Sequence, residues 1–230
     1  MDYAIIIGMK LEVRGLVKVF PAPPFSGGAP LRALAGASLE AGTGVTGVGG
    51  ANGCGKTTLF KTLAGVLEAD GGEIRAGGEP ADSARLRELA AYCPPNPRSF
   101  YFRLSAAENL RFFGALAGLT AAQALDRALH LADRLKLSRP DLERRFDRLS
   151  EGNMQKVSLI RAFSRRPPVL LLDEPFRGLD GLACTGLLEL IAEVSRATTV
   201  MLTSHSRELM ASAAHRELRM ADGRLAGGRP

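Results

Sequence analysis

The chain lacks tryptophan altogether and has only three cysteines among its 230 residues. Cys54, Cys93 and Cys184 lie far apart, form no CxxC pair and have no histidine at a spacing typical of metal ligands. Such a pattern excludes a disulfide framework and a structural zinc site as the basis of the fold. We therefore expect three free thiols.

Long hydrophobic runs are also missing. The longest apolar stretches, such as Ile5–Ile7 and Val169–Leu172, are far shorter than the roughly 20 residues that a membrane-spanning helix needs. The first eight residues contain the acidic Asp2 and resemble neither a secretory signal nor an anchor. We expect a soluble chain in which residues 1–8 are an extension before a domain that begins near Met9.

Acidic residues are fewer than basic ones: the chain has 24 Asp and Glu against 30 Lys and Arg, for a net charge of +6. A basic excess suits nucleic acid or an anionic membrane surface, but the basic residues are scattered and form no run. The pattern favours an ordinary solvated surface, so no specific nucleic-acid partner is expected. The length fits one domain with an additional subdomain.

What the chain does contain is a glycine-rich stretch, GANGCGKTT, from Gly50 to Thr58. It matches the pattern GxxxxGK[ST] at Gly50, Gly55, Lys56 and Thr57. Glycines let successive backbone N–H groups surround a phosphate, while the lysine adds a positive charge and the hydroxyl offers a ligand to Mg²⁺. The alternative is a glycine-rich turn that binds nothing. A short β-type run at Val45–Val48 before the loop argues against it.

The remaining pattern alternates between strands and helices. A helix with apolar positions through Leu67 should follow the loop, and two capping boxes, Ser105 with Glu108 and Thr120 with Gln123, predict two adjacent helices. This alternation indicates an open, mostly parallel α/β sheet interrupted by a helical insertion. Further strands are expected at Lys10–Phe20, Leu34–Leu39, Glu73–Arg75, Ala90–Cys93, Val169–Leu172 and Thr199–Leu202, and further helices at Asn153–Arg165 and Ala183–Arg196.

Polar side chains follow two of the buried strands. Asp173 and Glu174 come after Val169–Leu172, and His205 comes shortly after Thr199–Leu202. Ligands in open α/β sheets gather beyond the carboxyl ends of the strands, so these groups should meet the phosphate loop there. One carboxylate would serve Mg²⁺ and the next would reach a water. Simple helix N-capping is the alternative role for the acidic pair.

Five motifs in the same order resemble those of the ATP-binding subunit of an ABC transporter, over about residues 10–225. Besides the phosphate loop, LSEGN at Leu149–Asn153 resembles the family signature LSGGQ, and LLLDEP at Leu170–Pro175 resembles the Walker B segment. GLD at Gly178–Asp180 is similar to the D-loop, and TSH at Thr203–His205 contains the switch histidine. The resemblance implies a P-loop NTPase core with an N-terminal antiparallel β portion, spanning residues 9–94 and 166–228, and a helical subdomain at 95–165 that carries the signature.

The resemblance also implies roles for individual residues. ATP with Mg²⁺ would be bound, with Thr57 and Asp173 on the metal. Glu174 would be the general base, Lys56 would hold the phosphates and His205 would contact the γ-phosphate. Ser150, Gly152 and Asp180 would reach the ATP of a second subunit, in a homodimer or heterodimer. The complete set implied for the chain's own ATP is Phe20, Gly50, Asn52, Gly53, Cys54, Gly55, Lys56, Thr57 and Thr58.

Two positions depart from the family pattern. Pro95 stands where a glutamine is expected after Tyr-x-Pro, which predicts slower turnover or altered coupling, with Asn96 as a candidate substitute. Asn153 replaces the last glutamine of the signature. An aromatic cluster follows, and its members either receive a helix of a membrane partner or form the small subdomain's core: Phe100, Tyr101, Phe102, Phe112 and Phe113.

By this resemblance, the chain would power a separate transmembrane transporter chain through ATP-driven dimerisation, from the cytoplasmic face of the membrane. The compact form favours export. Two alternatives stay open. One is a soluble ABC-type ATPase acting on nucleic acid or ribosomes, and the other is a nucleotide-binding partner with weak hydrolysis, suggested by Pro95.

Overall fold

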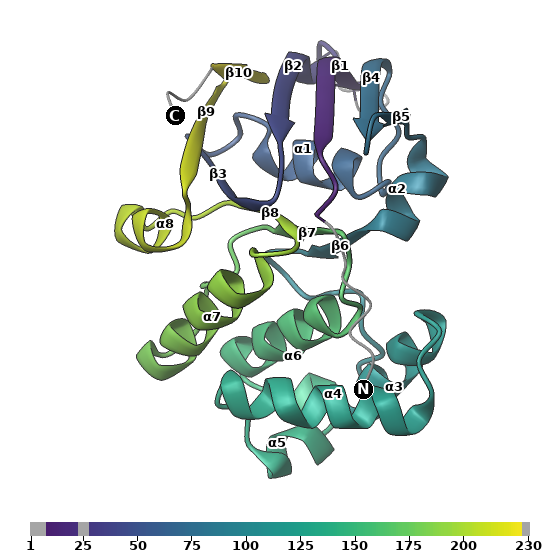
Figure 1. The fold of residues 1–230 in the computed structure, drawn as a ribbon, viewed down its shortest axis with the longest axis vertical. Helices are drawn as coiled ribbons and strands as arrows, with labels where there is room; N and C mark the ends of the chain where they lie inside the picture. The colour runs from purple at the N-terminus through teal and green to yellow at the C-terminus, as the bar shows by residue number, and fades with distance from the viewer. Residues whose placement is uncertain (1–7, 23–27, 227–230) are drawn as a thin grey trace.

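The computed structural model describes residues 8–22 and 28–226, so residues 1–7 of the expected extension lie outside it. Within the described residues the strands form two sheets (Figure 1). The larger sheet has the order β10-β9-β3-β8-β7-β6, in which neighbouring strands from β9 to β6 are parallel and only β10 is antiparallel. Its strands are β3 (Gly44–Gly50), β6 (Ala90–Cys93), β7 (Val169–Leu172), β8 (Thr199–Leu202), β9 (Arg216–Ala221) and β10 (Arg224–Ala226).

The smaller sheet is antiparallel and comes almost entirely from the N-terminal part of the chain. Its order is β2-β1-β4-β5, with strands β1 (Leu11–Phe20), β2 (Leu31–Ala41), β4 (Gly71–Ala76) and β5 (Glu79–Pro80). Together the two sheets confirm the α/β fold class with a mostly parallel sheet and an antiparallel N-terminal portion.

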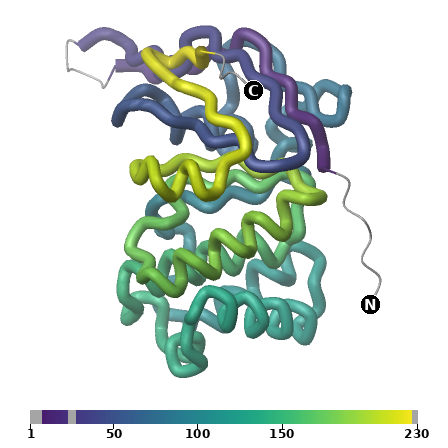
Figure 2. The backbone as a smooth tube through the Cα atoms, turned by 60° about the vertical axis from the view of Figure 1, so that its left-hand side comes forward, coloured from purple at the N-terminus to yellow at the C-terminus, as the bar shows by residue number. Residues whose placement is uncertain are grey.

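The helices divide into those that flank the sheets and those that gather at the end of the molecule opposite the antiparallel sheet (Figures 1 and 2). The second group follows β6 and is α3 (Ala106–Leu116), α4 (Ala121–Arg134), α5 (Arg139–Glu143) and α6 (Glu151–Ser164). The others are α1 (Lys56–Leu63), α2 (Ser83–Leu89), α7 (Gly181–Val194) and α8 (Arg207–Ala213).

Strand β7 shows how the two halves of the core are built. All four of its side chains are buried, but they alternate between two hydrophobic clusters. Val169 and Leu171 face the cluster shared with α1 and the antiparallel sheet, whereas Leu170 and Leu172 face the cluster shared with α6 and α7. Successive strand side chains point to opposite faces, so a strand covered on both sides must be apolar throughout.

Side-chain caps define where the helices begin. Ser105 and Thr120 form complete capping boxes with Glu108 and Gln123, as the sequence predicts. Ser150 caps α6 by accepting a hydrogen bond from the Asn153 N–H at 3.2 Å. Each cap satisfies backbone N–H groups that have no partner within the helix.

The first helix is shorter than its apolar pattern suggests. We expect it to continue through Leu67, but α1 ends at Leu63. Gly65 has a φ of +67°, which ends the helix in the left-handed conformation that glycine adopts most readily. The predicted end of the helix is therefore wrong by about one turn. The apolar residues beyond Ala64 belong to the connection towards β4.

Candidate active site

The phosphate loop connects β3 to α1 and is packed tightly from behind. Gly50 has a φ of +151°, and a Cβ there would collide with the Met220 carbonyl oxygen of β9 and lie 2.8 Å from Cys54 Sγ. Gly55 has a φ of +111°, and a Cβ there would collide with the Ala33 carbonyl oxygen of β2. Only glycine fits both the backbone angles and the space, so the neighbouring strands fix the course of the loop.

Lys56 is curled into this loop. Its Nζ donates hydrogen bonds to the carbonyl oxygens of Gly50 at 2.8 Å and Ala51 at 2.9 Å, and no carboxylate pairs with it among the described residues. Lys56 is also the first residue of α1, and the N-terminus of a helix carries a partial positive charge. The loop therefore concentrates positive charge without an internal counter-ion, which is the arrangement that a phosphate requires.

Asp173 lies directly after β7 and is 1% exposed. Its Oδ1 accepts a hydrogen bond from the Thr203 hydroxyl at 2.8 Å, and its Oδ2 accepts one from the Tyr92 hydroxyl at 3.2 Å. Burial, together with the charge of Asp173, raises the pKa of Tyr92 far above its usual range, so this phenol stays protonated and remains a donor. Two neighbouring strands thus fix the orientation of the carboxylate.

Glu174 is held differently from its neighbour. Its backbone φ is +52°, and its N–H donates to the Thr203 hydroxyl oxygen at 2.8 Å. Its Oε2 accepts a hydrogen bond from the His205 N–H at 3.0 Å, while the buried Oε1 has no hydrogen bond within the described chain. His205 Nε2 lies 3.4 Å from Oε1. A buried carboxylate oxygen without a donor is costly, and it implies that a partner such as water completes the site.

These groups line one pocket of about 290 Å³. The pocket brings together most of the residues expected to bind the chain's own ATP, but Gly50 and Cys54 do not line it. Leu31 and Ala33 do, and the sequence did not indicate either of them. The full lining is Phe20, Leu31, Ala33, Asn52, Gly53, Gly55, Lys56, Thr57, Thr58, Asp173, Glu174 and His205.

Phe20 and Leu31 form the apolar end of this pocket. They are opposite each other in the antiparallel pairing of β1 and β2, so their side chains emerge on the same face of the sheet. Leu31 is 65% exposed. A partly exposed aromatic ring beside an exposed leucine offers a flat apolar surface to a planar ligand group.

The residues expected to act on a second subunit's ATP do not line this pocket. Ser150 is exposed at the start of α6, and a Cβ on Gly152 would collide with the Gly178 carbonyl oxygen. Asp180 Oδ2 accepts a hydrogen bond from the buried Lys156 Nζ at 2.9 Å, and this contact lowers the pKa of Asp180. Packing therefore joins the LSEGN helix to the turn before α7.

Asn96 does not take the place expected for it. The residue lines a separate, larger cavity of about 810 Å³ and is absent from the lining of the smaller pocket. Tyr92, the third residue of β6, contacts the site through its hydrogen bond to Asp173.

The donor set suits Mg²⁺ and a nucleotide triphosphate. The Thr57 hydroxyl, the Asp173 carboxylate and the free Oε1 of Glu174 are hard oxygen donors at the polar end of the pocket. The uncompensated Lys56 and the glycine loop suit phosphates, and the apolar end suits a base.

Comparison with known proteins agrees with this arrangement. The family model described as ABC transporter matches residues 35–177. A lipoprotein-releasing system ATP-binding protein of Caulobacter vibrioides is 33% identical, with 94% of each chain covered. An sn-glycerol-3-phosphate import ATP-binding protein of Rhizobium johnstonii is 32% identical over 94% of this chain and 57% of its own length.

A solved structure of an ATP-binding subunit of an ABC transporter superposes with a TM-score of 0.81 at 27% identity, covering 95% of this chain and 89% of that one. The chain spans less than two thirds of the length of several of the curated relatives that it matches. The family model covers more than half of the chain, and the Caulobacter relative aligns along nearly its whole length. The chain therefore belongs to the ABC transporter family, as one of its ATP-binding subunits.

Proposed function

We propose that the chain binds and hydrolyses ATP and that this cycle powers a separate membrane-spanning transporter chain. The observation that carries the proposal is the environment of Glu174. Its buried Oε1 faces the pocket without a donor while its other oxygen is fixed by the His205 N–H. That carboxylate is in position to hold a water and to accept its proton.

Each residue of the site contributes one part of the chemistry. Lys56 and the loop N–H groups bind the phosphates and offset their charge as it shifts towards the leaving group. The Glu174 carboxylate takes the proton of the attacking water, and His205 lies beside it to bind the terminal phosphate. Mg²⁺, held by Thr57 and Asp173, would neutralise negative charge on the phosphate oxygens.

The working unit in this proposal is a head-to-tail dimer. Ser150 and Gly152 lie at the exposed N-terminus of a helix of 14 residues, where the macrodipole favours an anion, yet they do not line the chain's own pocket. A second copy or a homologous subunit would bring these residues to the phosphates. Two ATP molecules would then lie at the interface.

The chain would act at the inner face of the cell membrane through its partner. No helix in the part of the chain that the structure describes is long and apolar enough to span a bilayer. We propose export as the direction on the basis of the compact form alone, because the relatives described above include both an import and a lipoprotein-releasing protein.

Two substitutions test the proposal. Lys56→Ala should abolish Mg²⁺-dependent ATP hydrolysis by removing the charge that holds the phosphates. Glu174→Gln should lower kcat by about 10²–10⁴ while leaving ATP binding intact, because the amide cannot accept the proton. Phosphate release and binding of a fluorescent ATP analogue give the two readouts.

Glu193→Gln is a matched control, since this glutamate of α7 forms a surface ion pair with Arg134 and does not line the pocket. Its hydrolysis should equal that of the unchanged chain. Full activity in Glu174→Gln would rule out the glutamate as the base, and full activity in Lys56→Ala would rule out the proposed ATP site.

A further inference from the structure

Strand β1, which carries Phe20 to the apolar end of the smaller pocket, is longer than its neighbour β4. The two strands pair as far as Val17, which lies opposite Gly71, the first residue of β4. Beyond this pair β4 has no residue opposite Val19 or Phe20. A backbone N–H of β1 that points to this side therefore needs a hydrogen-bond acceptor from outside the ladder.

Asp70 supplies that acceptor. It immediately precedes β4, and its own N–H donates to the Val17 carbonyl oxygen at 2.9 Å. Its Oδ2 accepts a hydrogen bond from the Val19 N–H at 2.6 Å, and its Oδ1 accepts one from Lys18 Nζ at 2.9 Å. The Val19 N–H and the Lys18 ammonium lower the pKa of Asp70, so the carboxylate is ionised at neutral pH. We call Asp70 and Lys18 the strand clamp.

Lys18 connects the strand clamp to the aromatic ring. Its Nζ lies over the ring of Phe20, 5.8 Å from the centroid. The Lys18 side chain is only 15% exposed, and Asp70 fixes its ammonium group. A cation at this distance attracts the face of an aromatic ring. The strand clamp therefore restrains both the backbone next to Phe20 and the ring itself.

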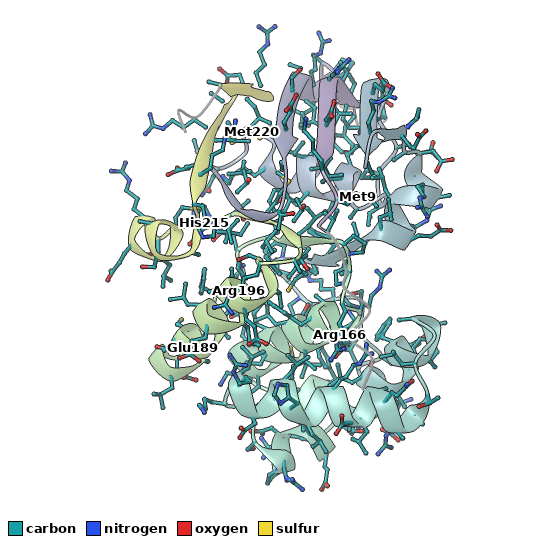
Figure 3. The ribbon with its side chains drawn as sticks, viewed as in Figure 1. Met9, Arg166, Glu189, Arg196, His215 and Met220 are labelled. Carbon is teal, nitrogen blue, oxygen red and sulfur yellow. The ribbon has the colours of Figure 1, made fainter. Side chains whose placement is uncertain are left out.

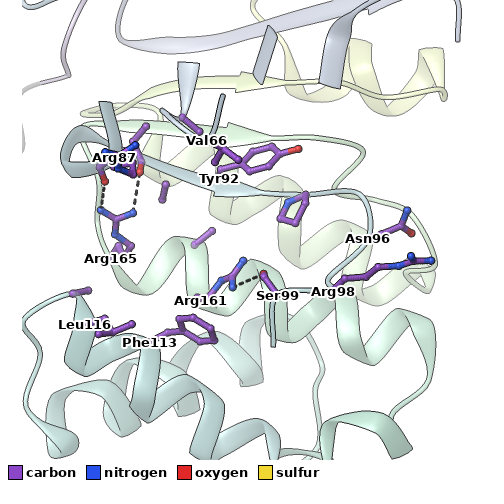
Figure 4. Close-up of a pocket in the computed structure, with 16 residues that line it drawn as sticks. Val66, Arg87, Tyr92, Asn96, Arg98, Ser99, Phe113, Leu116, Arg161 and Arg165 are labelled. Atoms are coloured by element: carbon purple, nitrogen blue, oxygen red, sulfur yellow. Dashed lines mark hydrogen bonds between the residues drawn. The ribbon is translucent and has the colours of Figure 1, made fainter. Parts of the chain in front are cut away.

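The strand clamp acts from outside the site. Lys18 and Asp70 line neither the smaller pocket nor the larger cavity shown in Figure 4. Phe20 does line the smaller pocket, together with Leu31, its partner across the two strands. An effect of the strand clamp on a bound ligand would therefore pass through Phe20.

The strand clamp also links the two ends of the pocket along the chain. Lys56 begins α1 at the phosphate end, and Asp70 is the last residue of the connection between α1 and β4. This connection is fixed to the helix, because the N–H groups of Val66 and Leu67 donate to the Lys61 carbonyl oxygen at 2.9 and 3.2 Å. One continuous segment thus holds the phosphate loop at its start and the end of β1 at its finish.

We propose that Asp70 is a positioning residue for the base of the bound nucleotide, which together with Lys18 holds the Phe20 ring where it stacks on that base. This inference rests on the proposed function, because it requires that the pocket binds ATP. A ring that is restrained before binding loses less freedom when the base arrives. The strand clamp should therefore strengthen the contact with the base and leave the contacts with the phosphates unchanged.

Equilibrium binding to the purified chain tests this division. The probes are ADP and inorganic pyrophosphate, each with Mg²⁺, because pyrophosphate keeps the phosphates and lacks the base. Calorimetry gives the Kd of each. Asp70→Ala should weaken ADP binding about fivefold or more, which is part of what a base stacked on an aromatic ring contributes. The Kd of pyrophosphate should not change.

Asp82→Ala is the matched control. Asp82 is also exposed and also accepts a backbone hydrogen bond, from the Arg85 N–H at 2.8 Å, but it caps α2 and does not line the pocket. This variant should bind both probes as the unchanged chain does.

Three further variants separate positioning from a general loss of structure. In a Phe20→Ala background, Asp70→Ala should have no further effect on ADP binding, because the ring through which it acts is gone. Lys18→Met removes the charge and keeps most of the stem, so it should weaken ADP binding as Asp70→Ala does. Lys18→Arg keeps the charge and should bind ADP like the unchanged chain. If thermal unfolding shows that Asp70→Ala does not fold, Lys18→Met and Lys18→Arg carry the same comparison.

The outcomes distinguish this inference from the proposed function. Unchanged ADP binding in Asp70→Ala, equal losses for ADP and pyrophosphate, or a further loss in the Phe20→Ala background would each overturn the positioning role and leave the nucleotide site standing. If the unchanged chain bound neither probe, or if Lys56→Ala bound both as tightly as the unchanged chain, both proposals would fall.

Discussion

Thr203 is the residue that holds the two carboxylates of the site in their different orientations. Its single hydroxyl donates to Asp173 and accepts from the Glu174 N–H, so it connects the end of β8 to the residues that follow β7. Glu174 has a positive φ, a conformation that non-glycine residues adopt only when their surroundings fix it. We regard Thr203 as a positioning residue.

Thr203→Val should therefore reduce both activity and stability. The substitution keeps the shape of the side chain but leaves the Glu174 N–H and one Asp173 oxygen without a partner, at a cost of about 1–3 kcal/mol in the free energy of unfolding. We expect kcat to fall at least tenfold, and the fall should vanish in a Glu174→Gln background, as double-mutant analysis of kcat would show.

Thr199→Val is the control, because Thr199 is equally buried on the same strand but donates to the Met9 carbonyl oxygen at the opposite end of β8. It should lose stability while keeping kcat. If both variants lost activity to the same degree, the effect of Thr203 would be one of general stability.

Cys93 should make the protein sensitive to alkali. Burial raises the pKa of its thiol to about 11 from a usual value of 9.0. Between these values the unfolded chain loses the proton while the folded chain keeps it, so stability is complete below pH 9 and falls as the pH rises towards 11. The loss should approach 3 kcal/mol, roughly 1.4 kcal/mol for each pKa unit.

Urea unfolding at intervals from pH 8 to 11 under reducing conditions measures this loss. Cys93→Ala should reduce the loss, most clearly between pH 9 and 10, below the range in which the raised pKa of Tyr92 also lowers stability. Cys184→Ala, which removes a less buried thiol, should change the curve less. Identical slopes in the unchanged chain and in Cys93→Ala would contradict the assignment.

The sequence predicted the residues of the site whose chemistry depends on local spacing. The GxxxxGK[ST] pattern placed Lys56 and Thr57, and the end of a buried strand placed Asp173 and Glu174. It did not indicate Tyr92 or Leu31, because both reach the site through strand register. Tyr92 is paired with Leu171 in the parallel sheet and Leu31 with Phe20 in the antiparallel one. Long-range register is not encoded in any short stretch.

At the scale of elements, the contact between α6 and the turn before α7 leaves no room for a side chain at Gly152. Gly152 lies in the first turn of α6, and a Cβ there would collide with the Gly178 carbonyl oxygen. An ion pair between Arg177 and Glu151 spans the same contact at 2.9 Å. The LSEGN helix and the turn thus approach each other as closely as backbones allow, so a displacement of one displaces the other.

Gly152→Ala should push the two elements apart. Alanine favours the helix itself, but the forced displacement costs about 1–3 kcal/mol, and it should lower ATPase activity while ATP still binds to the isolated chain. Gly181→Ala is the matched control, since that glycine begins α7 with nothing within 4 Å of a new Cβ and no positive φ. Normal activity in Gly152→Ala, measured by phosphate release, would show that the contact tolerates a methyl group.

The pattern of apolar residues predicted the buried elements better than the exposed ones. The bounds expected for β6, β7 and β8 are those observed, because these strands are continuous runs with few polar residues. No comparable pattern predicts α2, α5 and α8, which have five to seven residues each and are mostly exposed. Strand β9 was also missed, since only Leu218 and Met220 of its six residues are buried.

At the scale of the whole molecule, the proposed head-to-tail dimer predicts a change in mass. If Glu174 is the general base, Glu174→Gln should keep ATP bound without hydrolysing it. With ATP and Mg²⁺ this variant should then have twice the 24.4 kDa mass of one chain, as light scattering after gel filtration would measure. Without nucleotide it should elute as a monomer.

Ser150→Arg, combined with Glu174→Gln, should prevent the dimer by placing a bulky side chain at the exposed start of α6. Ser138→Arg is the control, because Ser138 is also an exposed cap, at the start of α5. Both variants lose about 1 kcal/mol of helix-capping free energy. A difference in dimer formation between them therefore reports on the position of the arginine and not on the lost cap. A dimer that persists in the Ser150 variant would place the interface elsewhere.

Strand β3, which leads into the phosphate loop, lies between β8 and β9 in the parallel sheet. His215, at the lower end of β9 in Figure 3, exchanges hydrogen bonds with Val45 across 170 positions of the chain. On a ribosome that adds 5–20 residues per second, the residues of β8 and β9 would therefore be synthesised on the order of ten to thirty seconds after those of β3. The phosphate loop is therefore synthesised long before the sheet that positions it can form. ATP can bind only after that sheet has formed, so nucleotide can assist only the last stage of folding.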